Sequence, residues 1–310
     1  MTPPVVIGTR GSPLALWQAE WVRSALLQRF PGVAVELSII KTQGDKILDV
    51  PLAKVGGKGL FVKEIEDALL NGRADVAVHS MKDMPAEIPA GLVIGAVPER
   101  EIPADVLISR NDLTLRQLPA GGVIGTSSLR RAAQLRHLRP DLEVVPVRGN
   151  VETRMGKLDT DRLAAVVLAA AGVKRLGLAQ RVAESLDEEI MLPAVGQGAL
   201  CIEVREKDSR IGAMIAALDH PATRTVVSGE RAFLKRLQGG CQVPIAGHGR
   251  LDGDQFILTG LVAEVDGGIV IKDRLSGPAE AAEQIGIELA ETLLRRGADQ
   301  ILQKLTGAVL

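Results

Sequence analysis

The sequence predicts an α/β protein with two similarly built lobes and a smaller α+β domain at its C-terminal end. Short apolar segments alternate with amphipathic ones from the start of the chain, a pattern typical of largely parallel sheets covered by helices. The tetrapeptide Val-Ile-Gly-Thr occurs at residues 6–9 and again at 123–126, each time before a predicted helix. Beyond residue 218, three strand-like segments follow one another without intervening helices.

The first lobe is expected to begin with a short strand followed by a helix. Ser12 can cap the free amides of that helix, and Pro13 suits its first turn. A second amphipathic helix is expected at residues 61–70. The segment between them, residues 42–59, is rich in glycine and has no clear period, so we expect a long functional loop. Strands are expected at residues 5–7, 33–40 and 75–79.

The same sequence signals predict the strands and helices of the second lobe and of the C-terminal domain. Buried strands of the second lobe are expected at residues 123–126, 143–147 and 163–170. A helix is expected at residues 221–237, and two glycines then break it. Asp-Gly turns join the three strands of the last domain, which are expected at residues 245–250, 256–265 and 268–274. One long amphipathic helix, residues 279–296, follows them.

The composition of the 310 residues argues against several classes of protein. With 37 basic and 38 acidic residues the net charge is −1, unlike that of a strongly basic nucleic-acid binder. Six aromatic side chains and no tyrosine leave few faces for base stacking and exclude a tyrosine general acid. Two cysteines cannot form a disulfide framework or a four-cysteine zinc site.

Membrane and export signals are also missing from the sequence. The longest apolar run, residues 163–173, has eleven residues. A membrane-spanning helix needs about 20 residues. No basic leader or cleavage site precedes Arg10. We therefore expect a cytoplasmic protein with neither membrane nor nucleic-acid partners.

Positive charge gathers where predicted strands end and helices begin. Residues 125–181 hold eleven basic and five acidic side chains. Solvated helix faces could account for such a run, but arginines recur at helix starts, where they oppose the helix dipole. Helix N-termini attract anions, and arginine adds bidentate recognition of carboxylates or phosphates. The pattern favours a site for a ligand with several anionic groups, built from residues 10–12, 127–131 and 148–150.

Three further motifs bear on chemistry. Asp83 follows Lys82 after a predicted strand, so the two form either a solvent-facing pair or an acid/base group in a cleft. The glycine- and lysine-rich segment 54–59 fails the pattern of a nucleotide-binding P-loop, and residues 196–201 fail the dinucleotide fingerprint. Cys201 lies in an apolar run typical of a buried residue, whereas Cys241, between glycines and a proline, suits an exposed reactive loop.

Taken together, these segments resemble the porphobilinogen deaminase family, also called hydroxymethylbilane synthases. The resemblance covers nearly the whole chain and is carried by residues 10–18, 54–61, 79–83, 125–131, 148–150, 192–200 and 239–245. It implies a transferase that joins four porphobilinogen molecules head to tail, releases ammonia and forms a linear tetrapyrrole. It further implies a dipyrromethane cofactor, with no metal or nucleotide.

The resemblance also implies an architecture of three domains. Two lobes would resemble type II periplasmic binding proteins, and a small α+β domain with a three-stranded antiparallel sheet would carry the cofactor cysteine. The implied boundaries are residues 1–98 with 198–218, residues 99–197, and residues 219–310. We expect a monomer whose lobes move during elongation.

The same resemblance assigns roles to individual residues. Asp83 would be the catalytic carboxylate, and Cys241 would hold the cofactor through a thioether. The remaining cofactor-binding residues would be Lys58, Ser80, Lys82, Ser128, Arg130 and Arg131, together with Asp83 itself. Substrate carboxylates would be held by Arg10, Ser12, Gln18, Arg148, Arg154 and Arg175. The loop over the site would include Lys54, Lys58 and Phe61.

Two other functions compete with this hypothesis. A cytoplasmic two-lobe binding module for a polycarboxylate ligand would explain the arginines, but not Cys241 or a third domain. A family member without activity, acting as a scaffold, would not need the intact Asp83 and Cys241.

Overall fold

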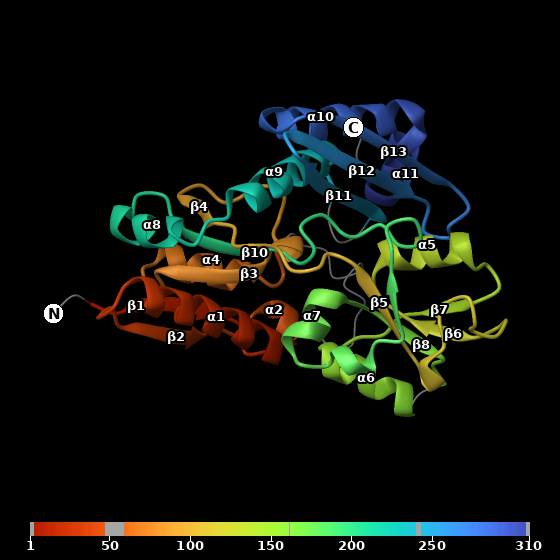
Figure 1. Cartoon of the computed structure of the whole chain (residues 1–310), viewed down its shortest axis with the longest axis horizontal. Helices are drawn as coiled ribbons and strands as arrows, with labels where there is room; N and C mark the ends of the chain where they lie inside the picture. The colour runs from red at the N-terminus through yellow and green to blue at the C-terminus, as the bar shows by residue number, and fades with distance from the viewer. Residues whose placement is uncertain (1–2, 47–58, 161, 240–242, 308–310) are drawn as a thin grey trace.

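The computed structural model describes residues 3–46, 59–160, 162–239 and 243–307. Three β-sheets organise these residues, two with five strands and one with three (Figure 1). Each sheet packs against its own helices, so the apolar core is divided into separate clusters. None of the helices in the described ranges is both long and apolar enough to cross a membrane.

The first sheet has the strand order β2-β1-β3-β10-β4. Strands β1 to β3 run parallel, whereas β10 is antiparallel to both of its neighbours. Its strands are β1 (Val5–Thr9), β2 (Val35–Ile39), β3 (Val76–Ser80), β4 (Leu92–Ala96) and β10 (Leu200–Arg205). Its helices are α1 (Pro13–Arg29), α2 (Gln43–Lys46), α4 (Lys63–Leu70) and α8 (Ser209–Ala216).

The second sheet repeats this pattern in the order β7-β6-β8-β5-β9. Its inserted antiparallel strand is β5, which pairs with β8 and β9. The strands are β5 (Asp105–Ser109), β6 (Val123–Gly125), β7 (Glu143–Val145), β8 (Ala165–Ala169) and β9 (Glu184–Leu186). The helices are α5 (Leu129–Leu138), α6 (Val151–Thr160) and α7 (Ala170–Arg175). The repeated Val-Ile-Gly-Thr segments overlap β1 and β6, which occupy the same place in the two sheets.

The third sheet is antiparallel throughout and lies beside both five-stranded sheets (Figure 1). The described structure confirms the predicted class, an α/β protein with a small three-stranded antiparallel sheet near the C-terminus. Its strands are β11 (Ile245–Asp252), β12 (Gln255–Ala263) and β13 (Val270–Pro278). Helices α9 (Pro221–Arg236) and α10 (Ala282–Leu293) pack on this sheet, and both Phe233 and Phe256 are fully buried between them and the strands.

One prediction of local structure was wrong, and a second was tested only in part. Where a single helix is expected at residues 279–296, the structure has a 3₁₀ turn followed by α10. A π turn at Leu294–Ala298 ends α10, and a further helix, α11 (Asp299–Thr306), comes after it. Gly297 adopts φ = +102° there, a conformation that interrupts a regular helix. The expected loop at 42–59 begins with the short helix α2, and residues 47–58 lie outside the described residues.

The chain crosses between the two large sheets twice, and one carboxylate ties both crossings to the third sheet. Glu230 of α9 is fully buried and pairs with Arg100 of the first crossing, with 2.7 Å between Arg100 Nη1 and Glu230 Oε1. It also accepts hydrogen bonds from the amides of Gly196 in the second crossing and Gly249 in β11, at 2.6 and 2.7 Å. The two crossings are in direct contact, because a Cβ at Gly198 would lie 2.3 Å from the carbonyl oxygen of Glu101.

Candidate active site

Most of the predicted site residues follow the carboxyl ends of parallel strands, where α/β sheets usually bind ligands. Arg10 follows β1, and Lys82 and Asp83 form a 3₁₀ turn (η1, Met81–Asp83) directly after β3. On the other lobe, Ser128, Arg130 and Arg131 begin α5 after β6, and Arg175 lies on α7 after β8. Arg148 and Arg154 flank the start of α6. The two sheets therefore present their charged segments at corresponding edges.

The Asp83 carboxylate has cations beside it but no direct partner. Within the described part of the chain, no hydrogen bond or ion pair reaches this carboxylate. Lys82 and Arg154 are its charged neighbours. Asp83 is also only partly buried, so its oxygens are free to accept hydrogen bonds from a ligand.

The cations around Asp83 are poorly compensated. Burial lowers the pKa of Lys82 to about 8, and the charge of Arg131 contributes to this shift. The closest polar contact of the ammonium group is a long hydrogen bond of 3.4 Å to Gln197 Oε1. Burial likewise lowers the pKa of Arg154 to about 10, with further repulsion from Arg131 and Arg148. Such a cluster is stabilised by any ligand that brings negative charge.

Arg130 and Arg131 are engaged within the protein. Both pair with Asp105 at the start of β5, each at 2.7 Å, and all three side chains are buried. Arg130 also donates to the carbonyl oxygen of Leu192, and Arg131 to that of Val167. Burial alone would raise the pKa of Asp105, but the charges of the two arginines hold it well below its usual range. Only the remaining guanidinium N–H groups are available to a ligand.

Arg10, on the first lobe, is held by a different carboxylate. Its Nε donates to Asp45 Oδ1 at 3.1 Å, and its Nη2 donates to the same carboxylate. The Phe61 ring covers the guanidinium, with 4.2 Å between Arg10 Cζ and the ring centre. The predicted substrate contact and a residue of the predicted loop therefore lie together, next to the unpredicted Asp45.

The remaining predicted residues have structural partners. Ser12 and Ser128 cap α1 and α5, since their hydroxyl oxygens accept from the amides of Ala15 and Arg131. Gln18 donates to Ser80 Oγ at 2.9 Å. Arg175 donates to the carbonyl oxygen of Gly198 and lies over the Trp17 ring, which joins α7 of the second lobe to α1 of the first.

Comparison with known proteins decides the family. Residues 5–213 match the family described as "Porphobilinogen deaminase, dipyromethane cofactor binding domain", and residues 225–295 match "Porphobilinogen deaminase, C-terminal domain". The porphobilinogen deaminase of Pelobacter propionicus is 58% identical over 96% of this chain and 96% of that protein. That of Geobacter metallireducens is 58% identical over 96% of this chain and 93% of that protein. The chain belongs to the porphobilinogen deaminase family.

Among solved structures, the probable amino-acid ABC transporter extracellular-binding protein ytmK from Bacillus subtilis matches with a TM-score of 0.44. It is 12% identical and covers 70% of this chain and 90% of that one.

Membership of the porphobilinogen deaminase family confirms the resemblance identified in the sequence. It confirms that the chain is a transferase. It also confirms the expected cofactor, because the matching family domain is described as binding dipyrromethane. It favours the enzyme over the two-lobe binding module. In the described ranges, no cluster of three or more His, Cys, Asp or Glu side chains is arranged to hold a metal ion.

Three residues assigned from the porphobilinogen deaminase pattern, Lys54, Lys58 and Cys241, lie outside the described residues. The other cysteine, Cys201, lies within β10 and is fully buried. Burial, together with the negative charge of Glu203, raises the pKa of its thiol. Cys201 is therefore the structural residue that its apolar surroundings predicted.

Sequence reasoning missed three residues of this site: Asp45, Asp105 and Gln197. Gln197 donates to Asp105 Oδ1 at 2.8 Å and accepts from Lys82, so it links the cations of both lobes. A signal for Asp105 was present, because a carboxylate directly before the apolar run Val-Leu-Ile needs a buried partner. No comparable signal marked Asp45, whose partner Arg10 is 35 positions away.

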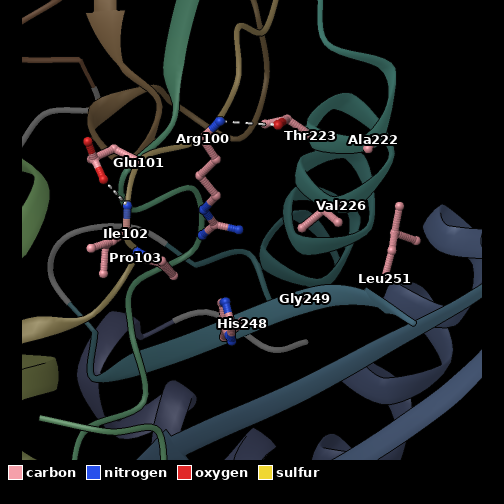
Figure 2. Close-up of a pocket in the computed structure, with 10 residues that line it drawn as sticks. All are labelled: Arg100, Glu101, Ile102, Pro103, Ala222, Thr223, Val226, His248, Gly249 and Leu251. Carbon is pink, nitrogen blue, oxygen red and sulfur yellow. Dashed lines mark hydrogen bonds between the residues drawn. The ribbon is translucent and has the colours of Figure 1, made fainter. Parts of the chain in front are cut away.

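A separate cavity of about 390 Å³ lies where the first crossing meets α9 and β11 (Figure 2). Arg100 extends toward β11 from one side, and His248 lies on that strand. None of the residues predicted for the site lines this cavity, and its arginine is already paired with Glu230. It is therefore distinct from the site around Asp83.

Proposed function

We propose that this chain carries out the reaction of its family, the stepwise head-to-tail condensation of four porphobilinogen molecules to hydroxymethylbilane with release of ammonia. The observation that carries the proposal is a carboxylate, Asp83, that has no hydrogen-bond or ion-pair partner among the described residues and lies near the partly buried cations Lys82 and Arg154. A site that binds only carboxylates would need the cations, but it would gain nothing from a carboxylate left free among them.

The residues around Asp83 fit a dipyrromethane. Such a group carries several carboxylates, and the depressed pKa of Lys82 identifies an ammonium group that lacks an adequate counter-charge. We infer that Lys82 and Arg131 pair with those carboxylates, with Ser80, Ser128 and Arg130 at the edge of the same cluster. When bound, the cofactor supplies a free pyrrole α-carbon to which the first substrate unit is joined.

Cys241 is the anchor that we propose for this cofactor. The chain has two cysteines, and thioether formation requires an accessible thiol with a thiolate form in reach. Cys201 meets neither condition, because it is fully buried and the pKa of its thiol is raised. The sequence around Cys241 has the glycines and proline of an exposed loop.

The residues of the chain divide the remaining work between binding and charge stabilisation. Asp83 accepts hydrogen bonds from pyrrole N–H groups, and its negative charge stabilises the positive charge that develops on the substrate as ammonia leaves. Arg10, Arg148, Arg154 and Arg175 hold the acetate and propionate groups of the substrate. Ser12 and Gln18 support the first-lobe side through the α1 cap and the bond to Ser80.

The protein is proposed to act in the cytoplasm as a monomer. Three domains are proposed to shift relative to one another as the product lengthens. They are residues 1–98 with 198–218, residues 99–197, and residues 219–310. The crossings joined by Glu230 are the points about which such shifts would take place.

Incubation of the protein with porphobilinogen tests the proposed function. We expect one ammonia per porphobilinogen consumed and one linear tetrapyrrole per four. Asp83→Asn should slow both by about 10²- to 10⁴-fold. Glu87 is an exposed carboxylate paired with Lys235, so Glu87→Gln should behave like the wild type. Tight binding of porphobilinogen without ammonia release would instead support the binding module.

A further inference from the structure

The guanidinium of Arg10 is already occupied by a carboxylate of the protein. Arg10 Nη2 donates to Asp45 Oδ1, and Nε lies 3.1 Å from Oδ1 and 3.4 Å from Oδ2, so both carboxylate oxygens contact the edge of the guanidinium at which arginine also binds free carboxylates. The side chains of Arg10 and Asp45 remain 24% and 29% exposed. Solvent and ligands can therefore reach the contact, unlike the sealed pairs that Asp105 makes.

Asp45 is fixed in this position by its own segment. Its Oδ2 accepts from the amide and the hydroxyl group of Thr42, at 3.2 and 2.8 Å. Although partial burial would raise it, the hydrogen bonds from Arg10 and Thr42 hold the pKa of Asp45 below its usual range. The carboxylate is therefore charged throughout the neutral pH range and always able to compete for Arg10.

A second segment holds α2 over Arg10. The amide of Gly44 donates to the carbonyl oxygen of Leu60 at 2.9 Å, and the amide of Gln43 donates to Glu64 at 3.0 Å. A Cβ at Gly44 would lie 2.2 Å from the Phe61 ring, so only glycine allows α2 and Phe61 to approach this closely. Residues 42–45 and 60–64 together form a clasp around the guanidinium.

We propose that Asp45 is an internal competitor for Arg10, which a substrate carboxylate must displace before it can bind there. This inference rests on the proposed function, in which Arg10 receives a carboxylate of porphobilinogen. Only a ligand with a carboxylate in reach of Arg10 can displace Asp45. A ligand that lacks one leaves Asp45 in place. Asp45 thus lowers the affinity of Arg10 for every ligand carboxylate, that of porphobilinogen included.

Asp45→Asn separates this role from a structural one. The amide oxygen can still accept from Thr42, but it lacks the charge that holds Arg10. A ligand carboxylate can bind Arg10 only in the fraction of the protein in which Asp45 does not occupy it, and this lowers the apparent affinity. Without that competition, we expect the variant to bind porphobilinogen about fivefold more tightly. In the otherwise wild-type enzyme, KM should fall by a similar factor and kcat should change little.

The binding measurement is calorimetric titration with porphobilinogen in an Asp83→Asn background, which prevents turnover. Asp67→Asn serves as the matched control, because it removes the same charge from an exposed position on α4. Asp45→Glu keeps the charge and should restore weaker binding. Unchanged or weaker binding by Asp45→Asn would overturn the inference and would make Asp45 an orienting residue for Arg10. Absence of porphobilinogen binding in every variant would instead overturn the proposed function, and the inference with it.

Discussion

Two arginine–aspartate contacts lie on opposite sides of the site and differ in burial. On the second lobe, Asp105 is fully buried and pairs with Arg130 and Arg131, whose side chains are 5% and 6% exposed. On the first lobe, Asp45 and Arg10 are 29% and 24% exposed. Removing one partner of a buried pair leaves an unsolvated charge, whereas water can replace a partner at an exposed pair. The Asp105 contact therefore belongs to the scaffold, and the Asp45 contact can be exchanged for a ligand.

The largest expected effect is that of Asp105→Asn on stability. Because Arg130 and Arg131 would lose their shared counter-ion within a buried site, the free energy of unfolding should fall by about 3 to 5 kcal/mol. Urea denaturation of the variant and the wild type measures this difference. The control is Asp141→Asn, which removes an exposed carboxylate from Arg139 and should leave the denaturation midpoint unchanged. Equal midpoints for all three proteins would contradict the scaffold role of Asp105.

Asp83 provides the opposite case, a carboxylate with no hydrogen-bond or ion-pair partner among the described residues. Asp83→Asn should reduce kcat by about 10²- to 10⁴-fold, the usual range for a group that acts on charge or protons at the reacting atoms. Its free energy of unfolding should stay within about 1 kcal/mol of the wild-type value, because the change breaks no hydrogen bond or ion pair of the described residues and removes only longer-range attraction to Lys82 and Arg154. Steady-state assays and urea denaturation test the two halves separately. A loss of stability as large as that of Asp105→Asn would place Asp83 in the scaffold instead.

Lys82 makes the comparison sensitive to pH. Without cofactor, the pKa of Lys82 in the folded protein is about 8, below its ordinary value of 10.5. The Cys241→Ser variant provides the cofactor-free protein for the measurement. Between these pH values the unfolded chain binds a proton that the folded chain does not, so stability should rise with pH. From pH 8 to 10 we expect a gain of about 1 to 2 kcal/mol relative to Lys82→Met in the same background. Parallel stability profiles for the two proteins would contradict the uncompensated ammonium group.

The smallest expected effect is that of Asp45→Asn on stability. A partly exposed ion pair that solvent can screen contributes about 1 kcal/mol or less, so the free energy of unfolding should fall by no more than that. Urea denaturation in low and high salt tests this expectation, since screening should reduce even this difference. A loss comparable with that of Asp105→Asn would remove the distinction between the two contacts.

The sequence was sufficient to predict the alternation of strands and helices but not how the inserted strands pair. The cap at Ser12 located the start of α1, and apolar periodicity located α4 and α9 within a few residues, because these signals are local. The pairing of β10 between β3 and β4 depends on contacts between segments more than 100 residues apart. The break at Gly297 was missed because one glycine in an amphipathic run is compatible with an uninterrupted helix.

For the candidate site, too, local motifs were predictable from the sequence and contacts between distant residues were not. Arginines at helix starts identified the anionic character of the ligand, since each motif lies within a few residues. What each arginine contacts was not predictable, because Asp105 is 25 positions from Arg130 and Asp45 is 35 positions from Arg10. The roles proposed for the site residues all stay predictions, and Lys54, Lys58 and Cys241 also lie outside the described ranges.

Intact-protein mass under denaturing conditions tests the central claim most directly. We predict that the wild type and Cys201→Ser carry an added mass equal to two porphobilinogen units, each less one ammonia, and that Cys241→Ser does not. If the purified wild type is unmodified, addition of porphobilinogen should produce the same increase at Cys241. An added mass that persists in Cys241→Ser, or a wild type that gains none even with porphobilinogen present, would contradict the account.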